Sequence, residues 1–187
     1  MSKDNPLRVI TRKVRISYAN VHEARAQEEG EKPKYSAAIL ISKDDEKTLG
    51  LIERAIEAAK KAGKEKWGGK IPRTLKLPLR DGDEERPEDE AYENMMFLNA
   101  SSIRKPQLVE RVNGELEEIE DPDDLYSGCY CRVSLNFYAF SVSGNKGIAV
   151  GLGNIQKLED GERLSGGSSA EDDFGDLDDD DDEDSLI

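Results

Sequence analysis

The alternation of apolar and polar residues is clearest between Gly128 and Phe140. From Cys129 to Ala139, every second residue is uncharged and most are apolar, whereas the residues between them include tyrosine, arginine, serine and asparagine. Successive side chains of a β-strand point to opposite faces of its sheet. This segment therefore predicts a strand with one buried face and one polar, aromatic face.

Strand-like patterns also occur in four other parts of the chain, at residues 7–18, 35–41, 95–103 and 147–155. In the first of these, basic residues alternate with Val14, Ile16 and Tyr18, which predicts a buried side and a basic side. The last should form a hairpin with the strand before it, through a turn at residues 143–146. Residues 112–115, with an Asn-Gly pair at their centre, indicate another hairpin turn.

A single helix is expected after the second strand, and Gly63 should end it. Acidic residues follow Ser42 and Asp44, the two candidate caps, as is typical of a helix N-terminus. The apolar residues that recur at helical spacing are Leu49, Ile52, Ile56 and Ala59. Further along, residues 80–93 are acidic and turn-like, which indicates an exposed excursion.

About five strands with one helix after the second, and no βαβ rhythm, predict a mainly β fold. An OB-fold-like five-stranded β-barrel is the commonest barrel with that strand count, and a β-sandwich is the alternative. We place this domain at residues 1–164. From residue 165 the composition changes to Gly, Ser and acid, which cannot bury a core, so residues 165–187 should be a disordered acidic tail.

The negative charge is concentrated in this tail. The whole chain has a formal net charge of −14, with 41 acidic and 27 basic residues. Eleven of the acidic residues and none of the basic ones lie in residues 171–187, so 30 acidic residues face 27 basic ones in the rest. The body is therefore close to neutral, and basic patches on it could attract nucleic acid.

The polar face of the strand at 129–140 is the best candidate for a binding surface. Tyr130 and Tyr138 offer rings on which bases could stack, and Arg132 offers a cation for phosphate. Packing of the two tyrosines beneath a loop or the helix is the alternative. The residues that we expect to contact DNA are Lys13, Arg15, Lys34, Lys66, Trp67, Lys70, Arg73, Tyr130, Arg132, Asn136, Tyr138 and Lys146.

Two further features have both a functional and a structural interpretation. Trp67 lies in a loop rich in glycine and lysine, where it could stack on a base or anchor the loop on the core. Ala149, Gly151 and Gly153 share one face of the last strand. Small residues there allow a ligand to approach the backbone, or allow the barrel to curve. The sequence leaves both questions open.

Catalytic and metal-binding patterns are weak. The chain has no Ser/His/Asp set and no Walker loop. The acidic residues Asp81, Asp83, Glu84 and Glu85 are more typical of a solvated loop than of a nuclease centre. With His22 the one histidine and no second cysteine pair, no zinc site is indicated. We therefore expect no enzymatic activity, no metal and no cofactor.

Other signals bear on the cellular compartment. Cys129 and Cys131 should lie on one side of a strand, poorly placed to bridge each other, and we expect two small buried residues in a reducing compartment. No apolar run is long enough to cross a membrane, and residues 1–10 lack the core of a signal peptide. These signals predict a cytoplasmic protein.

The order of these segments resembles the single-stranded DNA-binding proteins encoded by tailed bacteriophages and prophages, which have an OB-fold and an acidic C-terminus. The resemblance covers nearly the whole chain and is most specific at Tyr126-Ser-Gly-Cys129 and from Lys146 to Leu164. It implies a non-enzymatic protein that coats single-stranded DNA, without strong sequence preference, during phage replication, recombination or repair in the host cytoplasm. The oligomeric state stays open, a homodimer included.

The resemblance also implies that the acidic tail recruits replication or recombination proteins. The tail residues that we expect to bind such partners are Phe174, Asp178, Asp179, Asp180, Asp181, Asp182, Glu183, Asp184, Leu186 and Ile187. Many such tails end on an aromatic residue, whereas this one ends on Leu186 and Ile187, which would be its apolar anchor. As a polyanion, the tail should also compete with DNA for a basic groove. The alternative function is a protein-interaction scaffold or DNA mimic that binds no DNA.

Overall fold

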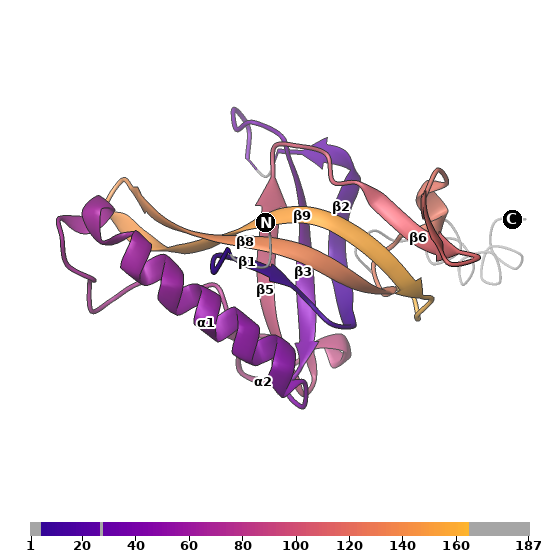
Figure 1. Ribbon diagram of the computed structural model, residues 1–187, viewed down its shortest axis with the longest axis horizontal. Helices are drawn as coiled ribbons and strands as arrows, with labels where there is room; N and C mark the ends of the chain where they lie inside the picture. The colour runs from indigo at the N-terminus through magenta and orange to yellow at the C-terminus, as the bar shows by residue number, and fades with distance from the viewer. Residues whose placement is uncertain (1–4, 27, 165–187) are drawn as a thin grey trace, which may run out of the picture.

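Five strands of the sheet close into a barrel (Figure 1). The computed structural model describes residues 5–26 and 28–164. In the ring, β2 (Val14–Arg25) pairs with β3 (Lys34–Ser42), β3 with β5 (Met95–Ser102), β5 with β9 (Asn145–Glu159), β9 with β8 (Tyr130–Val142), and β8 with β2. The β5–β9 pairing is parallel and the other four are antiparallel. This is the five-stranded barrel of an OB-fold, so the expected fold class is confirmed.

The helix α1 (Glu46–Ala62) follows β3, the second strand of the ring, as predicted. Its cap is Asp45, one residue beyond the predicted candidates, and the Asp45 carboxylate accepts a hydrogen bond from the Thr48 N–H at 3.1 Å. Gly63 ends the helix, as expected, and a Cβ at this position would lie 2.2 Å from the Ala139 Cβ. Glycine is therefore required where the end of the helix meets β8.

Shorter elements lie outside the ring and the helix. They are the strands β1 (Arg8–Ile10), β4 (Arg80–Asp81), β6 (Leu108–Val112) and β7 (Glu115–Glu118), the one-turn helix α2 (Gly82–Glu85), and 3₁₀ turns at Lys64–Trp67, Glu90–Tyr92 and Pro122–Asp124. The antiparallel pairing of β6 with β7 confirms the hairpin predicted at residues 112–115.

Residues 7–18 do not form one strand, which corrects the expectation from the sequence. The chain leaves the sheet after β1 and re-enters it at Val14. Between the two strands, the buried Thr11 exchanges hydrogen bonds with Val133: its Oγ1 accepts from the Val133 N–H at 3.0 Å, and its own N–H donates to the Val133 carbonyl oxygen at 3.0 Å. The break is therefore fixed by the buried, polar Thr11. The second strand then continues to Arg25, through part of the expected connection.

Tyr18 was also expected on the buried side of that strand, and this is wrong. Its side chain is 41% exposed and its φ is 47°, in the left-handed region. The pairing of β2 with β3 shifts register between Ser17 and Asn20, at this same residue. A left-handed residue at a bulge interrupts the two-residue period of the strand. The Tyr18 side chain therefore turns to the outside of the barrel.

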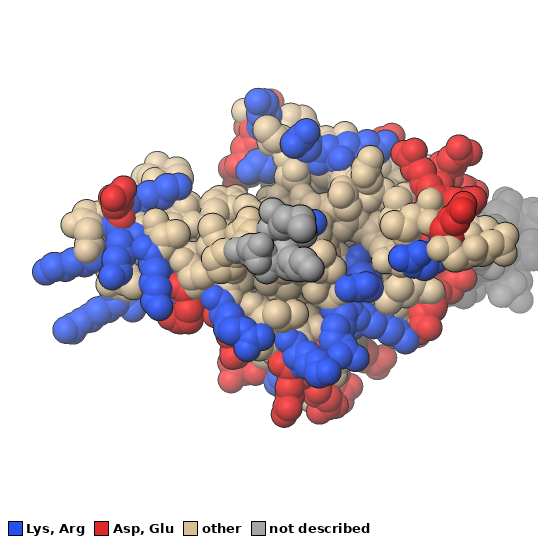
Figure 2. Space-filling model, in the orientation of Figure 1, with Lys and Arg blue, Asp and Glu red and all other residues tan. Residues whose placement is uncertain are grey.

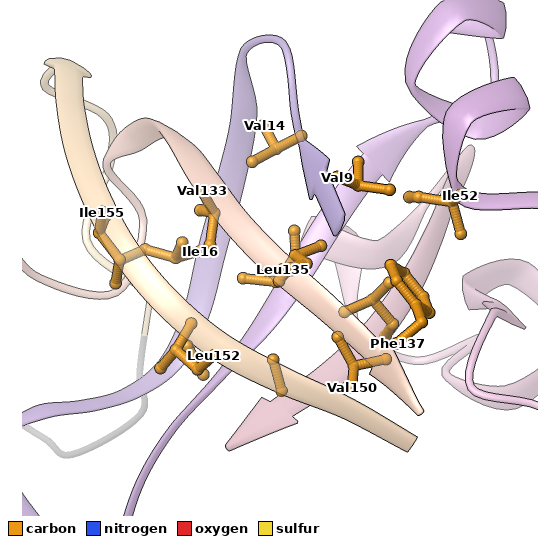
Figure 3. Packing of buried hydrophobic residues seen from close by; sticks show 14 of the residues in the cluster. Val9, Val14, Ile16, Ile52, Val133, Leu135, Phe137, Val150, Leu152 and Ile155 are labelled. Atoms are coloured by element: carbon orange, nitrogen blue, oxygen red, sulfur yellow. The ribbon is translucent and has the colours of Figure 1, made fainter. Parts of the chain in front are cut away.

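The alternation in β8 and β9 builds the centre of the core (Figure 3). The residues predicted on the inner face, from Cys129 to Ala139, are all buried, and Phe137 is 0% exposed. Figure 3 shows Leu135 and Phe137 beside Val150, with Ile52 reaching toward them from α1. Burying such a side chain stabilises the fold by about 1.5–3 kcal/mol.

Residues 80–93 form a cover rather than a fully exposed excursion. Tyr92 is 1% exposed and packs edge-on against Phe97, with ring centroids 5.0 Å apart. Leu40 completes this second cluster, on the outer face of β3 and β5. The segment reads as exposed because acidic residues surround the tyrosine in the sequence. The buried Tyr92 and the pairing of β4 with β5 attach it to the barrel.

Candidate nucleic-acid interface

The outer face of β8 has the polar, aromatic composition that the alternation predicted. Arg132 and Asn136 are exposed, Tyr130 and Ser134 are half-buried, and the Tyr138 side chain is 42% exposed. All five point away from the core side chains of the same strand. This face therefore offers rings and polar groups to a ligand.

A row of small or polar residues crosses four neighbouring strands at the middle of this face. Ser101 of β5 pairs with Gly151 of β9, Gly151 with Asn136 of β8, and Asn136 with Arg8 of β1. With strands about 4.8 Å apart, the row extends over roughly 14 Å. A Cβ at Gly151 would be 3.9 Å from the Tyr138 ring and would meet ordinary contacts, so packing does not require glycine there. The result is a low floor beside the Tyr138 ring.

Gly153, two residues further along β9, has a structural reason to be glycine. A Cβ there would lie 2.1 Å from the Ser134 Oγ. This hydroxyl instead accepts a hydrogen bond from the Asn154 N–H at 2.8 Å, and the Asn154 Oδ1 accepts one from the Gln107 N–H at 3.0 Å. These bonds fix the wall of a cleft at the edge of the floor.

Three cations surround this cleft, which we call the cationic cleft. Arg8 comes from β1, and Arg104 and Lys105 follow β5; neutral residues of β5, β8, β9 and the loop after β5 complete the lining. No carboxylate is among the described residues that line it, and none of the three cations pairs with a carboxylate elsewhere in residues 5–26 and 28–164. Figure 2 shows Lys and Arg gathered above and below the neutral surface over β8 and β9. Such a cleft attracts phosphate groups.

Sequence reasoning missed all three cations of the cleft. Arg8 was placed in a strand of mixed composition, and Arg104 and Lys105 simply follow a predicted strand. Lys34, which was predicted, lies nearby: it starts β3, whose next residue, Tyr35, pairs with Ser102 at the end of β5.

At the other end of β8, Tyr130 is held by two of the predicted cations. The Lys13 Nζ lies 5.1 Å and the Arg15 guanidinium 5.4 Å from the centroid of its ring. Lys13 also pairs with Glu159, and Arg15 donates hydrogen bonds to the carbonyl oxygens of Gly128 and Glu162, at 2.9 and 2.7 Å. These contacts tie β2 to the end of β9, so Lys13, Arg15 and Tyr130 form a structural cluster on this face.

Four other predicted cations, Lys66, Lys70, Arg73 and Lys146, gather at the far end of the β8–β9 hairpin. We call this end, residues 64–76 with Lys146, the basic arm. The Lys66 Nζ donates to the Ala139 carbonyl oxygen at 3.1 Å, and the Lys76 N–H donates to the Lys146 carbonyl oxygen at 3.0 Å, so the loop follows the hairpin. Lys70 and Arg73 are exposed in the same loop. The basic arm carries six cations and one glutamate.

Trp67 is a correction to the predicted DNA-contacting set. Its side chain is 6% exposed, and its Nε1–H donates to the Phe140 carbonyl oxygen at 3.0 Å. A buried ring with a satisfied N–H has no free face for a base, so Trp67 anchors the loop on the core. This was the structural alternative for the residue.

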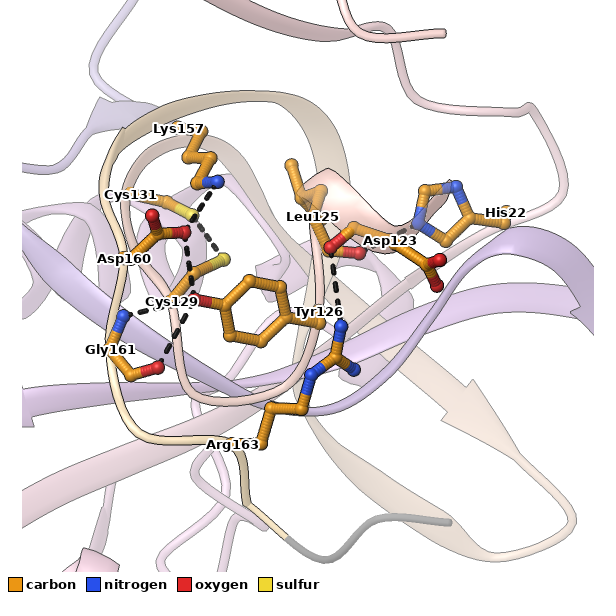
Figure 4. A network of polar contacts seen from close by, with 10 residues as sticks. All are labelled: His22, Asp123, Leu125, Tyr126, Cys129, Cys131, Lys157, Asp160, Gly161 and Arg163. Atoms are coloured by element: carbon orange, nitrogen blue, oxygen red, sulfur yellow. Dashed lines mark hydrogen bonds and ion pairs between the residues drawn. The ribbon is translucent and has the colours of Figure 1, made fainter. Parts of the chain in front are cut away.

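The end of β9 is fastened by a polar network around Tyr126 (Figure 4). The Tyr126 hydroxyl donates to the Asp160 carboxylate at 2.8 Å and accepts from the Gly161 N–H at 3.1 Å, while the Arg163 guanidinium lies 4.4 Å from the ring centroid. Lys157 pairs with Asp160 at 2.7 Å, and this hydrogen bond lowers the pKa of the Asp160 carboxyl. Partial burial raises the pKa of the Tyr126 hydroxyl.

Beneath this network, Cys129 and Cys131 are buried and free, as expected. Their sulfur atoms are 3.6 Å apart, and the hydrogen bond between them lowers the pKa of the Cys129 thiol. The Leu164 N–H donates to the Ser127 carbonyl oxygen at 2.9 Å, and its side chain packs against the cluster of Tyr92 and Phe97. The predicted tail residues, from Phe174 to Ile187, lie outside the described residues.

Two of the four acidic residues considered for a metal site pair with a lysine. Lys43 pairs with Asp81 at 2.8 Å and with Asp83 at 2.6 Å, which lowers the pKa of both carboxyls. In the described part of the chain, no group of three or more His, Cys, Asp or Glu side chains is arranged to hold a metal ion. None of the helices described is both long and apolar enough to cross a membrane.

Comparison with known proteins agrees with the fold and with the resemblance in the sequence. A putative protein, p50, of Acyrthosiphon pisum secondary endosymbiont phage 1 is 31% identical over 154 residues, which cover 77% of this chain and 79% of that protein. The single-stranded DNA-binding protein from bacteriophage Enc34, solved in complex with ssDNA, matches with a TM-score of 0.73 and 26% identity over 85% of this chain and 90% of its own.

A more distant match concerns the fold alone. The single-stranded DNA-binding protein gp2.5 encoded by bacteriophage T7 has a TM-score of 0.57 and 14% identity, over 90% of this chain and 93% of its own. The model of one protein family, described as the Enterobacter phage Enc34 ssDNA-binding protein, matches residues 7–186. The chain therefore belongs to the family of the Enterobacter phage Enc34 ssDNA-binding protein.

Proposed function

We propose that this protein binds single-stranded DNA without strong sequence preference, across the outer face of β5, β9, β8 and β1. The observation that carries the proposal is the low floor of Ser101, Gly151 and Asn136, which leads into a cationic cleft without carboxylates. Membership of a family of ssDNA-binding proteins, and the likeness to a relative solved with ssDNA, support it.

Each part of the surface would contact a different part of the ligand. Arg8, Arg104 and Lys105 would hold phosphates, because a neutral cleft leaves their charges uncompensated. Tyr138 would stack on a base, since its ring stands exposed beside a floor without large side chains. The basic arm would continue the contact with the backbone. Stacking and phosphate contacts read no base edge, so little sequence preference follows.

The acidic tail would act as a competitor for the same surface and as a recruiting segment for replication or recombination proteins. Both roles rest on its sequence, because residues 171–187 carry eleven acidic residues and no cation. In this function the protein needs no catalytic group, metal or cofactor, and it would work in the cytoplasm of the bacterial host.

The decisive experiment measures the affinity for a fluorescent oligonucleotide at several salt concentrations. We expect the affinity for a single strand to fall steeply with salt, with a logarithmic slope of about −0.7 per phosphate contact, and to change little between sequences. Binding to duplex should be weaker. Deleting residues 171–187 should raise the affinity at low salt, because a competing polyanion is removed.

The same experiment distinguishes ssDNA binding from the alternative function. A protein-interaction scaffold or DNA mimic would show no DNA binding with or without residues 171–187. Incubation with DNA and Mg²⁺ is expected to leave the strand intact, and cleavage products would contradict the non-enzymatic part of the proposal.

A further inference from the structure

Opposite charges gather at the two ends of the molecule's longest axis. One end is the basic arm, beside the end of α1. The other is formed by β6, β7 and the turn after them, residues 108–124, which we call the acidic hairpin; it contains eight acidic residues and one arginine. Figure 1 shows β6 at the end opposite the tip of the β8–β9 hairpin, and Figure 2 shows Lys and Arg concentrated at one end and Asp and Glu at the other.

The acidic hairpin has a hollow that is unusual in its lining. Six carboxylate residues form it: Glu110, Glu117, Glu118, Glu120, Asp121 and Asp124. In the described residues, these carboxylates do not come together in the threes that a metal ion needs. A hollow of this kind is suited to several separate cations, such as lysine and arginine side chains, rather than to one ion.

The acidic hairpin also has an unpaired strand and an exposed apolar residue. β7 is at the end of the sheet order and pairs with β6 alone among the described strands, so its outer edge is free. Leu116, within β7, is 54% exposed. Free edges and exposed apolar side chains are features of surfaces that bind other chains.

The basic arm carries the matching features. Its cations lie next to exposed apolar side chains in the sequence: Ile71, after Lys70, is 39% exposed, and Leu77, just outside the arm after Lys76, is 46% exposed. Val142, in the hairpin that the loop follows, is 62% exposed. Both ends thus combine apolar residues with charges, and the sign of the charge is opposite.

We propose that the basic arm of one copy of this chain docks on the acidic hairpin of a second copy. The two surfaces lie at opposite ends of the molecule, so they cannot meet within one chain. A contact between different surfaces of identical chains is heterologous and leaves one free surface at each end, so further copies can add in a row. This association needs no DNA and does not rest on the proposed function.

Sedimentation velocity without DNA tests the proposal on the full-length protein. We expect species larger than a monomer at 50 mM salt that dissociate at 500 mM, because screening weakens charge pairing. The hairpin variant Glu115→Lys/Glu117→Lys/Glu118→Lys and the arm variant Lys64→Glu/Lys70→Glu/Arg73→Glu should each be monomeric at 50 mM. A matched control is Glu28→Lys/Glu29→Lys/Glu31→Lys, which makes the same change of charge in the β2–β3 loop and should associate like the wild type.

Mixing the two variants gives the sharpest result. The arm variant keeps an intact acidic hairpin and the hairpin variant keeps an intact basic arm, so an equimolar mixture should form one-to-one dimers and nothing larger. A wild-type protein that is monomeric at 50 mM salt, or a mixture that stays monomeric, would overturn the proposal.

A competing explanation is that the acidic tail, and not the acidic hairpin, docks on the basic arm. Deleting the tail distinguishes the two explanations. If deletion of residues 171–187 abolishes association while the hairpin variant still associates, the tail is the occupant and the proposal is wrong. Thermal unfolding of the hairpin variant shows that it is folded, and failure of the folded variant to bind a short oligonucleotide would concern the proposed function alone.

Discussion

Replacing Tyr138 by alanine is the most direct test of the path that we propose for DNA. The ring is 42% exposed, and its edge lies 3.9 Å from where a Cβ at Gly151 would be. Removing a ring so exposed should change the free energy of unfolding by no more than about 0.5 kcal/mol. Any loss of affinity can then be assigned to the missing contact with DNA.

The expected loss follows from the stacking energy. A base stacked on an aromatic side chain contributes about 1–3 kcal/mol, so Tyr138→Ala should raise the dissociation constant by about 5- to 150-fold. Tyr138→Phe keeps the ring and should bind within about twofold of the wild type. Tyr138 carries no charge, so the salt slope should not change, whereas Arg8→Ala should make it shallower by about 0.7.

Fluorescence anisotropy with a labelled oligonucleotide measures both quantities. Thermal unfolding of each variant provides the control for folding. Tyr130→Ala is the internal comparison: its ring already packs between Lys13 and Arg15, so it should affect stability more than affinity. If Tyr138→Ala binds like the wild type while Tyr130→Ala loses affinity at unchanged stability, DNA does not cross the floor at Gly151.

Three other predictions concern the fold that supports this surface. Phe137→Ala should lower the free energy of unfolding in urea by about 3–5 kcal/mol, since the ring is 0% exposed, and Phe137→Leu should lower it far less. The emission of Trp67 should hardly change when DNA binds, because the ring is buried; strong quenching would place it at the DNA. Lys43→Met should lower the melting temperature at pH 7. Lys43 lowers the pKa of Asp81 and Asp83 from 3.8, so its stabilisation is present above that value and is lost as the pH falls through the lowered pKa. A melting difference that does not shrink at all as the pH is lowered from 7 through the acidic range would contradict this.

The barrel could be predicted because its signals are local. In β8 and β9 the two-residue period persists over most of each strand, and one buried face is enough to fix which side is inward. The same holds for α1, whose spacing and flanking residues are read within about twenty positions. Where a single backbone angle interrupts the period, as at Tyr18, the sequence gives no warning, because tyrosine is a common strand residue.

The cationic cleft could not be predicted, because it depends on pairings between distant segments. Arg8 reaches it through the pairing of β1 with Asn136, more than a hundred residues away, and Arg104 through the short parallel contact of β5 with Gly151. Two parallel strands are not joined by a tight turn, so no turn residues in the sequence indicate that β5 and β9 pair. Composition did indicate that cations would matter on a nearly neutral body, but it could not say which of them would share a surface.

Tyr130 and Tyr138 show what the alternation of a strand decides and what it does not. Both lie on the same face of β8, and the alternation alone predicts the same function for them. Their neighbours differ: β2 places Arg15 opposite Tyr130, whereas β9 places Ala149 opposite Tyr138. A ring flanked by cations becomes part of the structure, and a ring flanked by small residues stays free for a ligand. The period of the strand thus selects the face, and the pairing of the neighbouring strands selects which aromatic residue on that face can bind.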